Sequence, residues 1–146
     1  MSQVAGLTEV KISYSSPAVR ERAVWGALVP YDKVWRSGAN EATAFEVSTD
    51  VMVEGKPLPA GKYALFTIPG KDRWTVIFNK TQQWGAFNYE EAEDVLRVEV
   101  TPRPAPHHER LQFTIEDFTD TAATVVLAWE KVAVPVLALW GEEDPL

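Results

Sequence analysis

The chain has 146 residues, so we expect a single domain over residues 1–146 that is large enough to bury a real core. Its net charge of −7 excludes nucleic acid and anionic membrane surfaces as partners, because binding to phosphates needs concentrated lysine and arginine. The lack of cysteine excludes disulfides, thiolate metal sites and a cysteine nucleophile.

The first third of the chain predicts two strands separated by a crossover that contains one short helix. Residues 11–15 are β-prone and are followed by a break at Ser16 and Pro17. Residues 17–25 are the best helix candidate, because Ser16 can cap a helix and Pro17 suits its first position. Residues 43–48 then alternate between apolar and polar side chains, which is typical of a strand.

The middle of the chain predicts two hairpins. A short strand at 50–53 leads into a tight turn at 54–56. Strands at 62–68 and 74–78 flank a Pro-Gly-Lys-Asp sequence at 69–72, which is a strong turn signal. We therefore expect antiparallel pairing on both sides of these turns.

The last third predicts four further strands and one linker. The strands are expected at 95–101, 110–116, 121–130 and 132–140. Pro102, Pro104 and Pro106 predict an extended, exposed linker between the first two of them. About eight or nine short strands with frequent turn signals are typical of an all-β fold, either an antiparallel, jelly-roll-like β-sandwich or a flattened barrel.

A series of motifs runs through the chain in a fixed order. They lie at residues 10–17, 25–31, 34–43, 58–63, 66–70, 74–79, 84–89 and 94–98. In this order they resemble the DUF2911 family, a bacterial family of unknown function, over residues 10–131. The resemblance implies a shared fold and a shared site but supplies no reaction. The final strand, 132–140, departs from the family pattern. Residues 134–145 are similar to a strand and acid loop of α/β-hydrolases, but the chain has no Gly-x-Ser-x-Gly elbow and no histidine after the acid, so we interpret them as a final β-strand with a polar end.

The resemblance is densest at 34–43, where polar side chains precede a predicted strand. Arg36 can hold a carboxylate or phosphate through its planar guanidinium, and Asn40 can both donate and accept hydrogen bonds. Glu41 can act as a general acid or base if burial raises its pKa. We predict that Arg36, Asn40, Glu41 and Thr43 bind a ligand, with Glu41 and Arg36 as the catalytic candidates. The structural alternative is that these side chains pair with each other and hold the loop.

Aromatic side chains are the second candidate feature, since the chain has six tryptophans. Trp35, Trp84 and Tyr89 flank predicted loops, where aromatic faces can stack on sugar rings or other flat ligands. We predict that these three side chains line the ligand site, with core packing as the alternative. Trp74 and Trp129 lie in alternating strands and are predicted to be core residues.

Metal and cofactor signals are weak. His107 and His108 are adjacent, so on an extended segment their side chains point in opposite directions and do not chelate one ion together. The acidic run at 90–94 is interpreted as a solvated segment, and there is no glycine-rich phosphate loop. We therefore predict no metal and no cofactor.

Three functions stay open. The favoured one is a small-ligand-binding domain with an aromatic and polar pocket. The first alternative is a cofactor-independent enzyme of lyase, isomerase or cyclase type that uses Glu41 and Arg36. The second alternative is a protein-interaction domain, and pairing of exposed edge strands would also allow a homodimer.

The sequence also bears on location. No apolar run approaches the roughly 20 residues needed to span a bilayer. Residues 1–6 lack the basic and apolar regions of an export signal, which by itself favours a cytoplasmic protein, but the compartment stays open. The family resemblance favours an exported protein instead, because members of the DUF2911 family are often exported.

Overall fold

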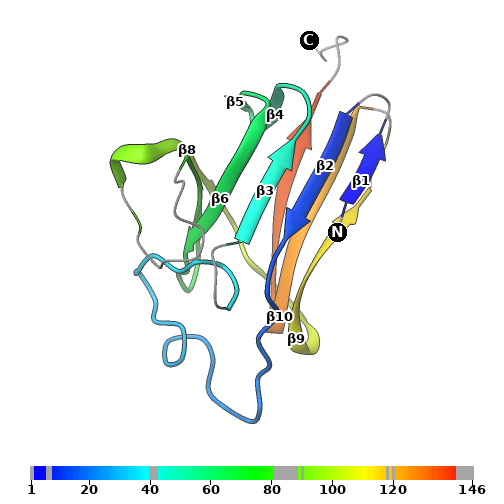
Figure 1. Ribbon diagram of the computed structural model, residues 1–146. Coiled ribbons are helices and arrows are strands. Elements are labelled where there is room, and N and C mark those ends of the chain that lie inside the picture. The colour runs from blue at the N-terminus through cyan, green and yellow to red at the C-terminus, as the bar shows by residue number, and fades with distance from the viewer. Residues whose placement is uncertain are drawn as a thin grey trace.

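The computed structural model describes residues 2–5, 8–39, 43–80, 89, 91–117, 119 and 121–140. This part of the chain contains ten strands and one 3₁₀ turn (Figure 1). The elements are β1 (Ser2–Ala5), β2 (Thr8–Ser13), β3 (Thr43–Val47), β4 (Val51–Val53), β5 (Lys56–Leu58), β6 (Gly61–Ile68), β7 (Trp74–Asn79), η1 (Glu91–Glu93), β8 (Asp94–Val100), β9 (Arg103–Glu116) and β10 (Ala122–Leu139). The all-β prediction is confirmed.

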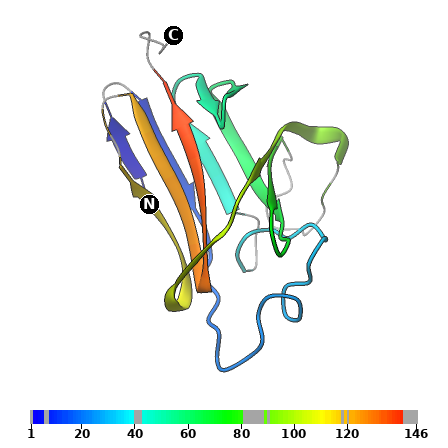
Figure 2. The same ribbon diagram turned by 180° about the vertical axis from the view of Figure 1, so that it is seen from behind.

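The strands form two antiparallel sheets that face each other. The larger sheet has the order β1-β2-β3-β6-β7-β8, and the smaller has the order β5-β4-β10-β9. Figures 1 and 2 show the two layers, with β2, β3 and β6 on one side and β9 and β10 on the other. One core cluster contains Phe45 and Phe78 from the larger sheet and Phe113 and Leu127 from the smaller. The fold is therefore a β-sandwich.

Both predicted hairpins form. Val51 pairs with Leu58 across the β4–β5 turn, and Ile68 pairs with Thr75 across the β6–β7 turn. At the first turn, Glu54 and Gly55 have φ values of 49° and 84°. Two successive residues with positive φ are the mark of the tight turn that suits a two-residue hairpin.

Strand β10 is bent back on itself. Glu130 has a φ of 57°, and the register with β9 shifts on both sides of this residue. The backbone N–H of Trp140 donates to the carbonyl of Thr121 at 2.8 Å, so the two ends of the strand lie side by side (Figures 1 and 2). The strands predicted at 121–130 and 132–140 are thus the two arms of β10, and the second arm pairs with β4.

The sequence predicted a linker at the proline segment, but in the structure most of this segment belongs to a strand. Pro104 and Pro106 lie inside β9, and Pro104 pairs with Val132 of β10. Strand β9 is at an edge of the smaller sheet. Edge strands tolerate proline because one row of their N–H groups is not needed for the ladder. The extended backbone was predicted correctly, but its place in the sheet was not.

The helix expected at 17–25 does not form. Arg20 and Glu21 have φ values of 50° and 58°, in the left-handed region, which ends any right-handed helix. Instead, the N–H of Val19 donates to the Glu109 carbonyl at 2.8 Å and the N–H of Leu111 donates to the Pro17 carbonyl at 3.0 Å. A two-turn helix is marginal alone, and pairing with β9 offers these backbone groups better partners.

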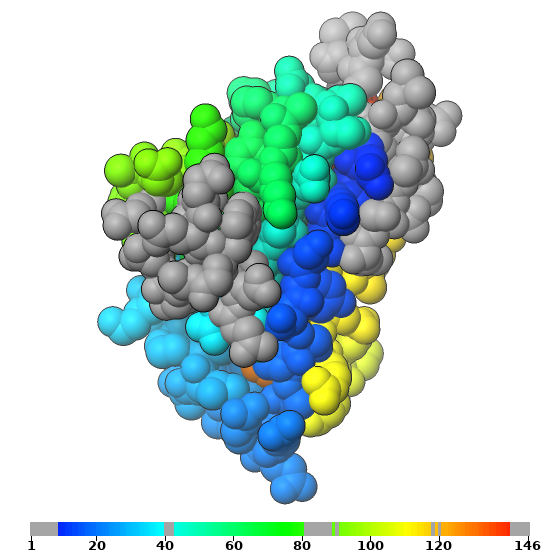
Figure 3. All heavy atoms as spheres, viewed as in Figure 1, coloured from blue at the N-terminus to red at the C-terminus, as the bar shows by residue number. Residues whose placement is uncertain are grey.

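The crossover between β2 and β3 covers one end of the sandwich. Its described residues, 14–39, form the lower end of the molecule (Figures 1 and 3). It is anchored to β6, because Trp35 and Thr67 exchange two backbone hydrogen bonds of 2.7 and 2.9 Å. Within the described residues, no helix has the length and hydropathy needed to cross a membrane.

Candidate ligand-binding pocket

Four tryptophans meet at the end of the sandwich that the crossover covers. Trp74 of β7 and Trp129 of β10 are both 1% exposed, which confirms their prediction as core residues. Trp25 and Trp35 come from the crossover. The ring centroid of Trp25 lies 5.7 Å from Trp35, 5.1 Å from Trp74 and 5.8 Å from Trp129. Through these edge-to-face contacts, the two sheets and the crossover pack together at this end of the sandwich.

Residues 35–39 and Thr43 are held by buried polar contacts. The Ser37 hydroxyl lies 3.1 Å from the Thr67 hydroxyl, and the Thr43 hydroxyl donates to the Ser37 carbonyl at 2.8 Å. The side chains of Ser37, Thr43 and Thr67 are all buried. Trp35 lies in the tryptophan cluster with 9% of its surface exposed. Thr43 and Trp35 therefore hold this segment against the core.

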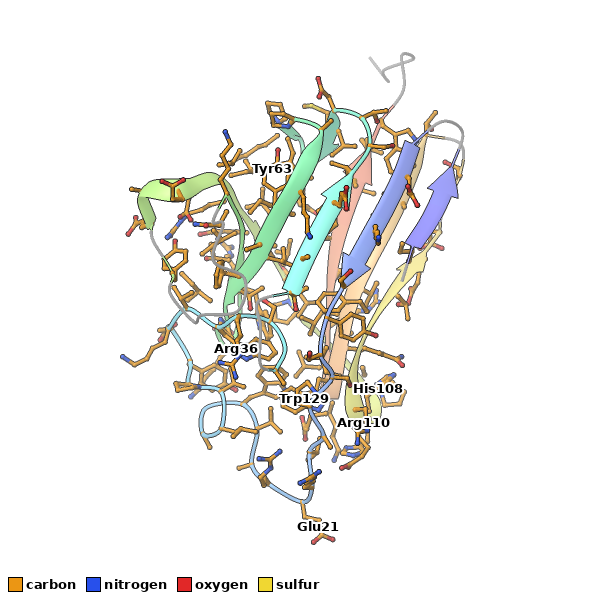
Figure 4. The ribbon with its side chains drawn as sticks, in the orientation of Figure 1. Glu21, Arg36, Tyr63, His108, Arg110 and Trp129 are labelled. Atoms are coloured by element: carbon orange, nitrogen blue, oxygen red, sulfur yellow. The ribbon has the colours of Figure 1, made fainter. Side chains whose placement is uncertain are left out.

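Tyr89 belongs to the opposite face of the larger sheet, and Arg36 lies near it in the chain segment that follows Val34. Val34 and Tyr89 pack against a small apolar cluster that includes Phe66, and the ring centroids of Phe66 and Tyr89 are 5.0 Å apart. Arg36 follows Val34 by two residues, so alternation directs it to the same face. Figure 4 shows Arg36 below the end of β6. The structure thus places Trp35 and Thr43 inside the sandwich and Tyr89 on the outer face of the larger sheet, while Arg36 is half-buried below the end of β6.

Tyr89 is part of a polar network. Its hydroxyl donates to Asp94 Oδ2 at 2.6 Å and accepts from an Arg97 N–H at 2.8 Å. Asn79 donates to the other Asp94 oxygen at 2.8 Å. Burial first, and then the hydrogen bond to Asp94, raise the pKa of Tyr89 to about 12, against the opposing effect of Arg97. Tyr89 is therefore held as a neutral hydrogen-bond donor.

The other predicted site residues lie outside the part of the chain that the structure describes. These are Asn40, Glu41 and Trp84. The enzyme hypothesis depends on Glu41, so it stays a prediction.

The two histidines have different partners. His107 Nε2 lies 3.2 Å from Glu109 Oε1, and His108 Nδ1 lies 2.8 Å from the Pro106 carbonyl. The pKa of Glu109 is lowered, mainly by the backbone N–H of Arg20 and then by His107. Among the described residues, no three metal-ligating side chains are grouped together.

A pocket of about 320 Å³ lies beside the tryptophan cluster. We call it the basal pocket; it is lined by Trp25, Tyr31, Gly70, Lys71, Trp74, Pro102, Arg103, Pro104, Lys131 and Val132. These residues come from four places: the crossover, the β6–β7 hairpin, the β8–β9 connection with the start of β9, and the bend of β10. Trp25 and Tyr31 are half-buried, whereas Trp74 is almost fully covered.

Backbone contacts bring the pocket walls together. The N–H of Asp32 donates to the Pro69 carbonyl at 2.7 Å, which ties the crossover to the β6–β7 turn. The Lys71 ammonium then lies 5.9 Å from the centre of the Tyr31 ring. Gly26 has a φ of 84°, and a Cβ atom there would lie 2.8 Å from Tyr31 Cε2. Only glycine allows the Tyr31 ring to lie this close to the crossover backbone.

The pocket carries basic side chains and no carboxylate. Lys71, Arg103 and Lys131 line it. Arg103 has a partner outside the lining, because its Nη2 lies 3.7 Å from Glu116 Oε1. The sequence did not predict that these three basic side chains lie together, since they are far apart in the chain. Two signals were present, namely Tyr31 in the 25–31 motif and Lys71 in the strong turn at 69–72.

Comparison with known proteins gives a family but no activity. The family model described as "Protein of unknown function (DUF2911)" matches residues 1–137. The match confirms the resemblance that the sequence motifs indicated, and it extends into the second arm of β10. Neither the curated proteins nor the solved structures contain a significant match to this chain.

Proposed function

The chain belongs to the DUF2911 family, which has no assigned activity, and we propose that it is a small-ligand-binding domain whose ligand occupies the basal pocket. The observation that carries this proposal is the pocket itself: about 320 Å³ of space with aromatic, apolar and basic side chains around it. Ligand sites combine aromatic and apolar side chains with a few polar groups, and their volumes are roughly 300–1,000 Å³.

The lining suits a ligand with a ring. Trp25 and Tyr31 are half-buried, so each presents part of its aromatic surface to the pocket. Pro102, Pro104 and Val132 add apolar surface. Aromatic side chains stack on sugar rings and flat ligands, and the polar Tyr31 hydroxyl can add a hydrogen bond.

The base of the pocket favours a preformed site. Trp25 contacts three other tryptophans, and Trp74 and Trp129 are fully buried beneath it. The Tyr31 ring lies against Gly26, where a Cβ atom would not fit, and the backbone of the next residue, Asp32, is bonded to Pro69. Little side-chain freedom is then lost on binding, which favours affinity.

The test is a screen of small ring compounds by ¹H–¹⁵N NMR, in which the indole N–H signals report on each tryptophan. We expect a binder to shift the Trp25 signal most, and Tyr31→Ala to weaken that binder about tenfold, or roughly 1.4 kcal/mol. Leu137→Ala is the matched control, because Leu137 is 40% exposed on the second arm of β10 and does not line the pocket. Binders that leave the Trp25 signal unmoved and tolerate Tyr31→Ala would contradict the proposal.

A further inference from the structure

We infer that the ligand of the basal pocket is anionic: a ring compound that carries a phosphate or carboxylate group. This inference rests on the proposed function and adds the chemical class of the ligand. It is carried by the juxtaposition of Lys71, Arg103 and Lys131 around an aromatic wall.

The charge of the pocket is opposite to that of the whole chain. The sequence has 14 lysines and arginines against 21 aspartates and glutamates. Yet the lining of the pocket holds three basic side chains and no acidic one. These bases repel one another, so an anion between them relieves the repulsion as well as adding attraction.

Two carboxylates in contact with this group, Glu130 and Glu116, leave the bases available. Glu130 precedes Lys131, but its Oε1 accepts the backbone N–H of Lys131 at 2.7 Å and it does not line the pocket. Within the described residues, neither Lys71 nor Lys131 forms an ion pair with a carboxylate. The Arg103–Glu116 pair is 3.7 Å long and both side chains are about half exposed, so it holds the guanidinium only weakly.

The positions of the groups suggest how such a ligand is held. Lys71 lies near the Tyr31 ring, with the ammonium 5.9 Å from the ring centre. A ligand ring against Tyr31 and Trp25 therefore brings a substituent within reach of Lys71. Arg103 can grip two oxygens of a phosphate or carboxylate through its planar fork, whereas the lysines act as point charges.

The experiment is calorimetric titration of the full chain with three probes: phenyl phosphate, inorganic phosphate and benzyl alcohol. We expect phenyl phosphate to bind more tightly than either of the other two, because only it has both the ring and the charge. Lys71→Gln and Lys131→Gln should each weaken the binding of phenyl phosphate about three- to tenfold and leave the affinity for benzyl alcohol unchanged. Added salt should weaken the binding of phenyl phosphate but not that of benzyl alcohol.

A control and four contrary outcomes make the test decisive. Lys56→Gln removes an equal charge from β5, outside the pocket lining, and should have little effect. Equal binding of phenyl phosphate and benzyl alcohol, unaffected by the lysine changes, would overturn the anionic class but keep the proposed function. Equal binding of phenyl phosphate and inorganic phosphate would overturn the ring requirement. If no probe binds, or if Tyr31→Ala changes nothing, the proposed function itself fails.

Discussion

Gly26 supports the pocket at the scale of a single residue. Gly26 and Gly55 share a φ of 84°, but a Cβ atom would meet Tyr31 at Gly26 and nothing within 4 Å at Gly55. We expect Gly55→Ala to lower the free energy of unfolding by about 1–2 kcal/mol through backbone strain alone. Gly26→Ala should lower the free energy of unfolding by at least about 1 kcal/mol more than Gly55→Ala does, because the Tyr31 ring must move. Urea unfolding measures both losses, and equal losses would show that the Tyr31 contact is unimportant.

Tyr89 makes the outer face of the larger sheet sensitive to alkaline pH. Its folded pKa of about 12 lies above the ordinary tyrosine value of 10.0. Because the folded pKa is raised, the stabilisation is complete below about pH 10 and is lost as pH rises through about 12. We expect the difference in unfolding free energy between the wild-type chain and Tyr89→Phe to shrink across this window.

The pH series is made by urea unfolding of both proteins. The comparison isolates Tyr89, because the raised pKa of Tyr63 affects both proteins alike. A difference that stays constant through pH 12 would mean that the Tyr89–Asp94 bond does not hold the proton as described.

At the scale of elements, the crossover segment gives a test that separates a loop from a helix. Glu21 lies at the tip of the crossover, exposed to solvent, with a φ of 58° (Figure 4). Glycine adopts this conformation without strain, so Glu21→Gly should be more stable than Glu21→Ala by about 1 kcal/mol. A helix at 17–25 would give the reverse order by a similar amount, roughly 0.8–1.0 kcal/mol. Thermal unfolding of the two variants decides the sign.

The elements show what local sequence patterns can and cannot predict. Turn chemistry located both hairpins, because Glu54-Gly55 and the residues at 69–72 leave few other conformations open to the chain. The helix at 17–25 failed because pairing with β9, about ninety residues away, outweighs a weak local preference. The proline segment was extended as predicted, but only the sheet order shows that it lies at an edge.

The fold is confirmed, whereas the candidate site at 34–43 stays a prediction. Of its described residues, Trp35 and Thr43 are buried in the sandwich and Arg36 is half-buried. The basal pocket depends instead on where the bend of β10 and the β6–β7 turn meet the crossover. Contacts between segments so far apart leave no pattern in a single sequence.

At the scale of the whole molecule, the tryptophan cluster joins the two sheets. Trp129 contacts Trp25 and Trp35, with ring centroids 5.8 and 6.0 Å away, and its N–H donates to the Glu109 carbonyl at 3.2 Å. We expect Trp129→Ala to destabilise the protein by about 3–5 kcal/mol, and Leu137→Ala, at an exposed site, by less than about 1 kcal/mol. Urea unfolding gives both values, and near-ultraviolet circular dichroism reports on the coupled tryptophans.

If Trp129→Ala does not fold, Trp129→Phe provides the measurement, since it keeps an aromatic ring and should lose about 1–2 kcal/mol. The importance of the cluster would be refuted by a Trp129→Phe variant that is as stable as the wild-type chain and keeps its circular dichroism.

The central position of β10 also has a consequence for synthesis on the ribosome. Strand β10 lies between β4 and β9 in the smaller sheet, yet it follows both in the chain. The larger sheet can therefore assemble while translation continues, but the smaller sheet stays in two pieces, β4–β5 and β9 with the first arm of β10, until the second arm emerges and pairs with β4. A nascent chain halted at Glu130 would leave uncovered the part of the inner face that the second arm of β10 packs on, which is the kind of surface that chaperones protect.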